Sequence, residues 1–319
     1  IAADWSKPSV EKVAKHLASP DQRVRMKAQF ELVRRKEIKS LQTIYLNQGQ
    51  PLLARLHALW GLGQLGRTGT TLEAAAFLAG LKDSDPELRA QTAKVLSEFQ
   101  APAVATALIK LLADPEDRPR FFAAIALGKL KTPAVYEALA IYASTHGTDP
   151  YHRHAAIVGL VGCATSTQLA ALSTHESRPL RLAAVVALRR QRAPEITAFL
   201  SDPDPLLVAE AASAIHDDTS IPAARDALAQ LLDSPTHHER TLRRALSAAL
   251  RLRSPEQAAR VAKFATSNTT PKHLRLVALN ILNTWPNPPV LDTVEGRHRP
   301  LPKISASTIA PAVTESLTT

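Results

Sequence analysis

The sequence predicts an all-α fold, an α-solenoid of about nine helix-turn-helix repeats. The first observation is composition. Of the 319 residues, 45% are hydrophobic but only 4% are aromatic, so Ala, Leu and Val must supply most of the core, as in closely packed helices. The second is self-similarity, because related segments recur every roughly 27 to 35 residues. The third is that no segment shows the alternation typical of a strand.

Nine segments share one helical pattern, and an arginine stands near the start of eight of them. The segments are residues 23–32, 53–62, 87–96, 118–127, 152–160, 180–188, 206–215, 242–250 and 274–282. The arginines, here called the arginine column, are Arg25, Arg55, Arg89, Arg120, Arg153, Arg181, Arg243 and Arg275. A small residue follows three positions later in most segments and an aliphatic residue seven positions later, which places both on one helix face. Each segment is therefore expected to be an amphipathic helix.

A second helical pattern lies between these segments, for example "LEAAAFLAGL" (72–81) and "VYEALAIYA" (135–143). Several of these patterns begin at or just after a proline, which is harmless in a first helical turn because its missing N–H would be unpaired there anyway. These prolines are Pro102, Pro133, Pro194, Pro222 and Pro255. The loops often read Asp-Pro or Ser-Pro, which caps a helix start and forces a turn.

Three aspartates accompany the arginine column. Asp21, Asp85 and Asp149 each stand four residues before a column arginine, a spacing at which opposite charges meet on a helix surface. Stacked repeats would also bring each arginine near an aspartate of the neighbouring repeat. We interpret the column as a structural ladder that fixes the stacking of the repeats, in preference to a ligand-binding row.

The pattern Asp-x-x-x-Arg-x-x-Ala-x-x-x-Leu resembles the short bacterial form of the HEAT repeat. That resemblance implies a scaffold for protein contacts, with the concave surface formed by the second helices as the expected partner face. The chain alone is then expected not to be an enzyme, and neither a cofactor nor a small-molecule substrate is indicated.

A narrower resemblance rests on "SPDQRVRMKAQFELVRR" (19–35), "ARLHALWGLGQLGR" (54–67) and "NTWPNPPVLDTVEGRHRPL" (283–301). These segments are similar to the solenoid region of the large exported haem-binding proteins of planctomycetes and verrucomicrobia. Such proteins join a sugar-dehydrogenase-like propeller to HEAT-like repeats and a c-type cytochrome domain with a Cys-x-x-Cys-His motif. The resemblance implies a module that positions those two parts, in a periplasmic or otherwise exported setting. This chain has one cysteine and no strand pattern, so the redox parts of the family are absent from it.

The formal net charge of +10 and the basic pI of about 9.9 allow a polyanion partner as an alternative to a generally basic surface. HEAT-like alkylpurine DNA glycosylases grip duplex phosphate with a basic solenoid, so a nucleic-acid-binding protein of that type is the rival hypothesis. A bilin-lyase type of HEAT-like protein is a second rival, but no chromophore partner is indicated. Several basic runs, such as 34–36 and 189–192, close predicted helices, where cations complement the helix dipole.

The candidate catalytic and thiol groups are interpreted as structural residues. Cys163 lies in an apolar run and is interpreted as a small buried residue, because a lone cysteine can form neither an internal disulfide nor a Cys-x-x-Cys site. Asp217 and Asp218 stand where a helix should end, so we interpret them as solvated turn charges and not as an acid and base pair.

The histidine pairs are likewise interpreted as polar residues and not as metal ligands. His152 and His154 are two residues apart on a predicted helix and point in different directions, whereas ligands on one face are four apart. His237 and His238 fall at a turn that enters a helix. No metal site is therefore predicted.

The stretch "HALWGLGQLG" (57–66) has the Gly-x-Gly-x-x-Gly spacing of a dinucleotide-binding loop. Such a loop needs a strand before its first glycine and a helix that begins at its end. Here the glycines follow the repeat pattern, so Gly61 is expected to fill a small-residue position of a helix and Gly66 to end that helix. His57 and Trp60 are assigned to the same helix and to no site.

The repeats are expected to span residues 1–284, followed by a proline-rich extended segment, residues 285–319, in which residues 304–316 could form one short helix. The first residue is Ile1, so we expect a processed or trimmed amino terminus. No run of about 18 apolar residues occurs, and we expect a soluble chain without a membrane span.

Overall fold

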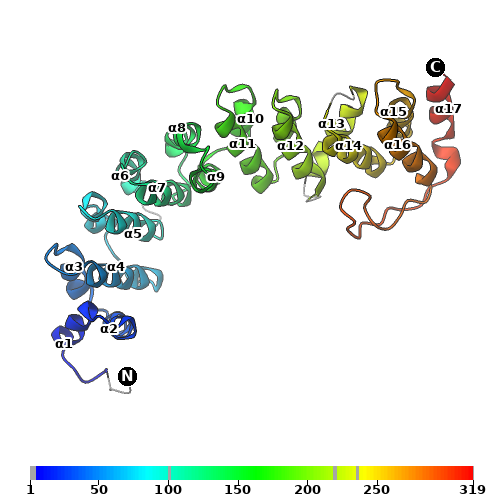
Figure 1. Ribbon diagram of the computed structural model, residues 1–319. Helices are drawn as coiled ribbons and strands as arrows, with labels where there is room; N and C mark the ends of the chain where they lie inside the picture. The colour runs from blue at the N-terminus through cyan, green and yellow to red at the C-terminus, as the bar shows by residue number, and fades with distance from the viewer. Residues whose placement is uncertain (1–4, 100–101, 218–220, 235–236, 319) are drawn as a thin grey trace. The chain divides into compact units, whose positions relative to one another are not determined.

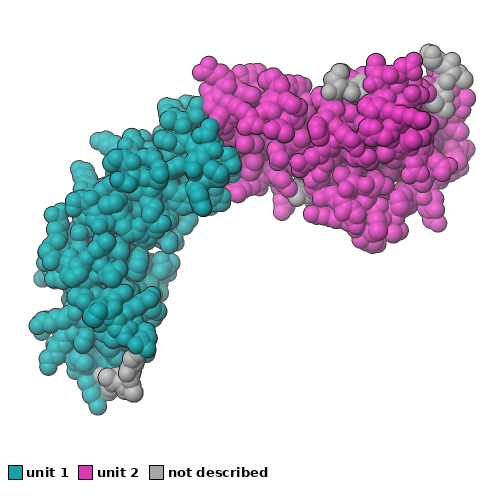
Figure 2. All heavy atoms as spheres, viewed as in Figure 1, with its two compact units in different colours: residues 1–164 teal, residues 165–319 magenta. Residues whose placement is uncertain are grey.

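The computed structural model describes residues 5–99, 102–217, 221–234 and 237–318 (Figure 1). These residues form an all-α repeat fold, as predicted. Within the described ranges there is no β-strand, and a single antiparallel bridge joins Leu291 and His298. The chain divides into two compact units, residues 1–164 and 165–319, which are coloured separately in Figure 2.

Unit 1 consists of paired helical segments. Its long helices are α2 (Gln22–Arg34), α4 (Leu52–Arg67), α5 (Pro86–Leu96), α7 (Asp117–Lys129) and α9 (Pro150–Cys163). The segments that precede them are α1 (Val10–Lys15) with η1 (His16–Ala18), α3 (Ile38–Leu46), η2 (Ala74–Phe77) with η3 (Gly80–Lys82), η4 (Pro102–Val104) with α6 (Ala105–Leu111), and η5 (Pro133–Val135) with α8 (Tyr136–His146).

Unit 2 repeats this arrangement. Its long helices are α11 (Arg178–Gln191), α12 (Pro205–Asp217), α14 (Glu239–Leu252) and α16 (Lys272–Thr284). The segments that pair with them are α10 (Ser166–Ala171) with η6 (Leu172–Thr174), η7 (Pro194–Ser201), η8 (Pro222–Ala224) with α13 (Arg225–Gln230) and η9 (Leu231–Asp233), and α15 (Pro255–Thr266). The chain continues through η10 (Ala306–Thr308) to α17 (Ala310–Thr318).

The nine predicted pattern segments all fall in long helices, and successive long helices of a unit pack on one another. The small residues of the pattern make this close packing possible, since they leave room for the neighbouring helix. All of them are fully buried: Ala28, Ala58, Ala123, Ala156, Ala184, Ala211 and Ala278. The aliphatic residues four positions further on are buried as well, except for Leu282, which is half-buried while Ile281 takes its place in the core.

The segments between the long helices are less regular than predicted. Residues 72–81 read as a helix in sequence, but the structure has only the short 3₁₀-helices η2 and η3 there. The seventh pair likewise uses the 3₁₀-helix η7 in place of an α-helix. The predicted proline starts do occur, since η4, η5, η7, η8 and α15 all begin at their proline.

Helix α4 contains the whole "HALWGLGQLG" stretch, so a dinucleotide-binding loop is not formed. The prediction that Gly66 ends this helix is wrong. The helix runs on to Arg67, and the left-handed residue that follows it is Gly69, with φ +88°. Gly66 is instead needed for packing, because a Cβ there would lie 2.4 Å from Cε1 of Phe99.

Helices α7 and α9 approach each other more closely than side chains would allow. A Cβ on Gly162 would lie 2.0 Å from the carbonyl oxygen of Gly128, and a Cβ on Gly128 would lie 2.6 Å from Cα of Gly159. The three glycines therefore let two backbones touch directly. Cys163, the next residue, is buried as expected.

The segment that follows Trp285 belongs to unit 2 and does not form a unit of its own. Trp285 is fully buried, and α17 packs on α15. Arg253, at the end of α14, donates hydrogen bonds to the carbonyls of Trp285 and Pro302. Across the part of the chain that the structure describes, no helix combines the length and apolar character needed to cross a bilayer.

Candidate protein-binding surface

The arginine column makes two kinds of contact. In five repeats the guanidinium donates to the backbone carbonyls five and six residues earlier, in the loop that enters its own helix. These arginines are Arg25, Arg89, Arg120, Arg153 and Arg181. Arg55 and Arg275 donate instead to the carbonyl ten residues earlier, that of Tyr45 and Ala265 respectively. Each arginine therefore fixes the approach of the chain to its helix.

The second kind of contact is an ion pair with the next repeat. Arg55 pairs with Asp83, Arg89 with Asp114, and Arg181 with Asp202. In each case the aspartate lies in the loop that follows a short helical segment of the next repeat, and it also accepts a hydrogen bond from the backbone N–H two residues later. These three pairs join successive repeats.

The aspartates predicted as ladder partners cap helices and do not pair with the arginine column. Asp21, Asp85 and Asp149 are N-caps, whose carboxylates accept hydrogen bonds from backbone N–H groups of the first turn. Asp21 forms its ion pair with Arg23 and not with Arg25, and hydrogen bonds from the Arg23 side chain and then from its backbone N–H lower the pKa of Asp21 to about 2. The i, i+4 pairing is therefore not the contact that the structure shows, because a capping carboxylate turns back toward its own helix end.

Arg243 makes neither of the two contacts that the other arginines of the column make. Its guanidinium is exposed and pairs with Glu239 on the same helix. The neighbouring Arg244 is the buried arginine of this repeat, and its Nε and Nη2 each lie 2.9 Å from an Asp217 oxygen.

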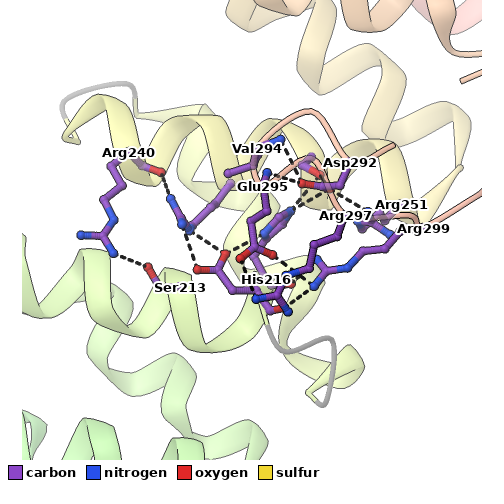
Figure 3. Close-up of polar contacts among 12 residues, drawn as sticks. Ser213, His216, Arg240, Arg251, Asp292, Val294, Glu295, Arg297 and Arg299 are labelled. Atoms are coloured by element: carbon purple, nitrogen blue, oxygen red, sulfur yellow. Dashed lines mark hydrogen bonds and ion pairs between the residues drawn. The ribbon is translucent and has the colours of Figure 1, made fainter. Parts of the chain in front are cut away.

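Asp217 belongs to a buried cluster that the sequence analysis missed (Figure 3). We call it the C-terminal ionic cluster, and it consists of His216, Asp217, Arg244, Ser247, Arg251, Asp292, Glu295 and Arg299. The side chain of Asp217 is only 14% exposed, so its interpretation as a solvated turn charge is wrong. Asp218, its predicted companion, lies outside the described residues.

His216 is the centre of this cluster. Its Nδ1 lies 2.9 Å from Asp217 Oδ1, and its Nε2 lies 2.9 Å from Ser247 Oγ and 3.3 Å from Asp292 Oδ2. Burial by itself lowers the pKa of His216, but the hydrogen bonds to Asp217 and Asp292 outweigh it and raise the pKa. Since the Ser247 hydroxyl donates to Asp292, both ring nitrogens of His216 face hydrogen-bond acceptors, an arrangement that favours the protonated ring.

Asp292 and Asp217 are held in their ionised form. Burial raises the pKa of Asp292, but hydrogen bonds from His216 and from Arg251, whose Nη2 is 2.7 Å away, bring it well below its usual range. The pKa of Asp217 falls to about 2 because His216 and Arg244 similarly outweigh its burial. Arg299 donates to the backbone carbonyls of His216 and Asp217. The cluster thus fastens residues 290–299 onto α12 and α14.

The donor atoms of His216, Asp217 and Glu295 lie within 4.8 Å of one another, as in a metal site. Each is already engaged, however, since Asp217 faces Arg244, Glu295 faces Arg297 and Arg299, and both ring nitrogens of His216 are hydrogen-bonded. A metal ion would have to displace arginines, so the donor set fits an ion-pair network and not a metal centre.

The predicted histidine pairs are separated by the fold. His152 is buried, with its Nδ1 2.6 Å from the Tyr142 hydroxyl and its Nε2 3.0 Å from Asp117, whereas His154 is exposed. His238 caps α14 through its Nδ1, which accepts from the N–H of Arg240. These contacts are those of structural polar residues.

Large apolar side chains gather on one face of the long helices of unit 1. We call this the aromatic face, formed by Met26, Phe30, Trp60, Phe121, Phe122 and Tyr151. Met26, Phe30 and Tyr151 are exposed, by 39%, 47% and 76%, and the other three are half-buried. Contiguous exposed apolar side chains of this kind are typical of protein-binding sites.

Two hollows open on the aromatic face. The first, of about 340 Å³, lies over α2, α4 and α5 and is lined by Met26, Phe30, His57 and Trp60 among others. The second, of about 380 Å³, lies over α7 and α9 and is lined by Phe121, Phe122 and Tyr151. His57 and Trp60, which were assigned to a helix and to no site, do belong to α4 but also line the first hollow.

The floor of the first hollow is fixed by hydrogen bonds. His57 Nδ1 lies 2.7 Å from Gln29 Oε1, and Gln29 donates to Gln64 at 2.8 Å. The indole N–H of Trp60 donates to Gln91 at 3.0 Å. Burial, with a smaller effect of Arg25, lowers the pKa of His57, so this ring is neutral near pH 7. The floor of this hollow and its Trp60 wall are therefore held in place before any partner binds.

A signal for this face was present in the sequence. Phe30, Trp60 and Lys94 each stand five residues after a column arginine, a position that lies on the opposite side of the helix from the buried stripe. Large side chains at an exposed repeat position indicate a binding surface, but the low aromatic content of the chain obscures this signal.

Residues 38–119 and 74–161 match the family model of HEAT repeats. No curated protein sequence matches the chain. The chain is similar to the solved structure of human deoxyhypusine hydroxylase in complex with glycerol, with 22% identity over 78% of this chain and 97% of that chain and a TM-score of 0.34. It is also similar to an engineered protein, with 15% identity over 96% and 92% and a TM-score of 0.40.

A third similar structure is the complex of CpcE and CpcF of phycocyanin lyase from Nostoc, with 18% identity over 99% of this chain and 97% of that chain and a TM-score of 0.31. The activities in these names belong to those proteins. The match to HEAT repeats covers residues 38–161, and the helix pairs of both units make the chain an all-α helical repeat protein.

Proposed function

We propose that this chain is a non-catalytic scaffold that binds other proteins, and that the aromatic face of unit 1 is a contact surface. The observation that supports it is the row of exposed apolar side chains over two hollows on a pre-ordered floor. Exposed aromatic anchors beside pockets supply much of the binding energy of protein interfaces. Among the described residues, the titratable groups that cluster are engaged in ion pairs or caps, which fits a structural role.

We further propose that the proteins held by the scaffold are a sugar-dehydrogenase-like part and a c-type cytochrome part, in a periplasmic setting. Only the sequence resemblance of residues 19–35, 54–67 and 283–301 supports this step. The partners could be separate proteins or adjacent domains of a larger chain, and the coding region on either side would show which.

The test measures binding of the purified chain to a c-type cytochrome and a dehydrogenase encoded beside it, by biolayer interferometry. The variant Phe30→Ala/Trp60→Ala removes two walls of the first hollow. We expect it to weaken binding about tenfold or more. The matched control Ile141→Ala/Leu206→Ala removes two apolar side chains that are 66% and 64% exposed elsewhere, and it should bind as the wild type does.

Equal binding by both double variants would show that the aromatic face is not the contact surface. No binding of either protein would remove the redox-scaffold assignment. A salt-sensitive shift of random-sequence duplex DNA, in place of protein binding, would favour the nucleic-acid-binding alternative.

A further inference from the structure

Two cationic side chains lie between the two hollows of the aromatic face. Lys94 lines the first hollow, and its Nζ lies 5.8 Å from the ring centroid of Phe122, which lines the second. The guanidinium of Arg118, which also lines the second hollow, lies 5.4 Å from the same ring. A chain that crosses from one hollow to the other therefore passes over two positive charges.

These cations are incompletely neutralised. Among the described residues, no carboxylate lies within ion-pair distance of the exposed Lys94, nor of Arg67 at the rim of the first hollow. Arg118 pairs with Glu87, yet its side chain remains 59% exposed. The other carboxylate of this region, Glu98, is already paired with Lys129. The strip between the hollows is thus positive and still able to accept carboxylates.

The outer edge of the second hollow carries negatively charged side chains. Asp117 and Asp149 line it there. Asp117 pairs with Arg120 and His152, yet its side chain remains 77% exposed. A continuous polyanion such as a nucleic acid would meet these carboxylates, and it would gain little from the apolar walls. The arrangement of charges instead calls for a ligand that is apolar at two points and acidic only between them.

We infer that the aromatic face binds an acidic segment of a partner protein, in which two bulky apolar side chains flank one or more carboxylates. The apolar side chains enter the two hollows, and the carboxylates meet Lys94 and Arg118. This inference rests on the proposed function and adds to it the chemistry of the partner. The hydrogen bond from Trp60 to Gln91 favours such binding, because little side-chain entropy of Trp60 is then lost.

The probes are fluorescein-labelled synthetic peptides in which Phe and Leu flank two to six Glu residues, with Gly-Ser ends. Matched peptides carry Lys in place of Glu, or Ala in place of Phe and Leu. Fluorescence anisotropy with the full chain should show binding of at least one Glu spacing. The Lys peptide and the Ala peptide of that spacing should each bind about tenfold more weakly or worse.

Charge variants of the chain test whether Lys94 contacts the carboxylates of the bound peptide. Lys94→Glu should weaken binding of the Glu peptide about tenfold and strengthen binding of the Lys peptide. Lys110→Glu is the matched control, because Lys110 is also exposed but lies on α6, away from the aromatic face, and it makes the same change in net charge. It should bind both peptides as the wild type does.

Three results would overturn the inference: no Glu peptide binds, Glu and Lys peptides bind alike, or the two charge variants weaken binding equally. Its failure is separable from failure of the proposed function. If whole partner proteins bind in a manner that depends on Phe30 and Trp60 but not on Lys94, the scaffold function stands and the acidic segment does not.

Discussion

Arg181 and Asp202 form a buried ion pair that joins two successive repeats of unit 2. Nε of Arg181 lies 2.8 Å from Asp202 Oδ2, and the two side chains are 9% and 0% exposed. Arg181 also donates to two carbonyls of the loop before its own helix, so one guanidinium connects three parts of the chain. The pair is a contact between repeats and not within one helix.

We expect Asp202→Ala to lower the free energy of unfolding by about 3–5 kcal/mol, because it leaves a buried guanidinium without its counter-ion. Urea denaturation followed by circular dichroism measures the change. The control is Asp233→Ala, which removes the 58% exposed partner of Arg260 and should cost less than about 1 kcal/mol. Equal losses in the two variants would contradict the structural role given to the pair.

The attachment of residues 290–299 should depend on pH. His216 has a raised pKa, so its contribution is complete below its unfolded pKa of about 6.5 and is lost as the pH rises through the folded value. Asp217 has a pKa of about 2, so its contribution is present above about pH 4 and is lost as the pH falls toward 2. The segment is therefore held most firmly between about pH 4 and pH 6.5.

Hydrogen exchange of the amides of Asp292 and Arg299, which donate to the carbonyls of Arg297 and Val290, reports this attachment directly. After correction for the intrinsic rate, protection should fall between pH 6 and pH 8.5 in the wild type. His216→Gln, which cannot become an imidazolium, should show no such fall. Protection that is identical at both pH values in the wild type would exclude His216 as its cause.

The contact between α7 and α9 predicts opposite outcomes for two helical glycines. Gly162→Ala places a Cβ 2.0 Å from a backbone oxygen, which cannot move aside, and should cost about 2 kcal/mol or more. Gly63→Ala meets only side-chain atoms, of Val95 at 3.3 Å and of Arg67 at 3.7 Å, and gains helix propensity, so it should be neutral or stabilising by up to about 1 kcal/mol. Thermal unfolding of both variants checks this, and an equal change in melting temperature would count against the close backbone contact.

Cys163 should be unreactive in the folded protein. Its side chain is buried, and burial raises the pKa of the thiol to about 11, so the reactive thiolate is scarce at neutral pH. With a thiol reagent such as Ellman's reagent at pH 7.5, we expect labelling only at the rate of unfolding, and one rapid equivalent in denaturant. Rapid labelling of the native chain would mean that the end of α9 is open to solvent.

The sequence was sufficient for the repeat fold because the pattern is local. The small residue three positions after Arg25 or Arg55 and the aliphatic residue seven positions after it fix one helix face without any knowledge of the neighbours. The same reasoning failed for residues 72–81, where the helical pattern yields only 3₁₀ turns.

The ion-pair partners depend on which side chain a loop presents to the next repeat, and spacing alone does not reveal that. In "DSDP" (83–86), the second aspartate is the cap that was recognised, whereas the first is the partner of Arg55. The C-terminal ionic cluster was missed for a related reason. Asp292 looks like an ordinary loop residue until the fold brings it to His216.

The fastening of residues 290–299 also has a consequence for the order of folding. Most contacts of a helical repeat join segments that are close in sequence, and such low contact order favours fast folding. The hydrogen bond from Arg299 to the carbonyl of His216 spans 83 residues. A loop of that length is costly to close before the repeats between its ends have formed. The C-terminal ionic cluster should therefore assemble last, on α12 and α14 that are already folded.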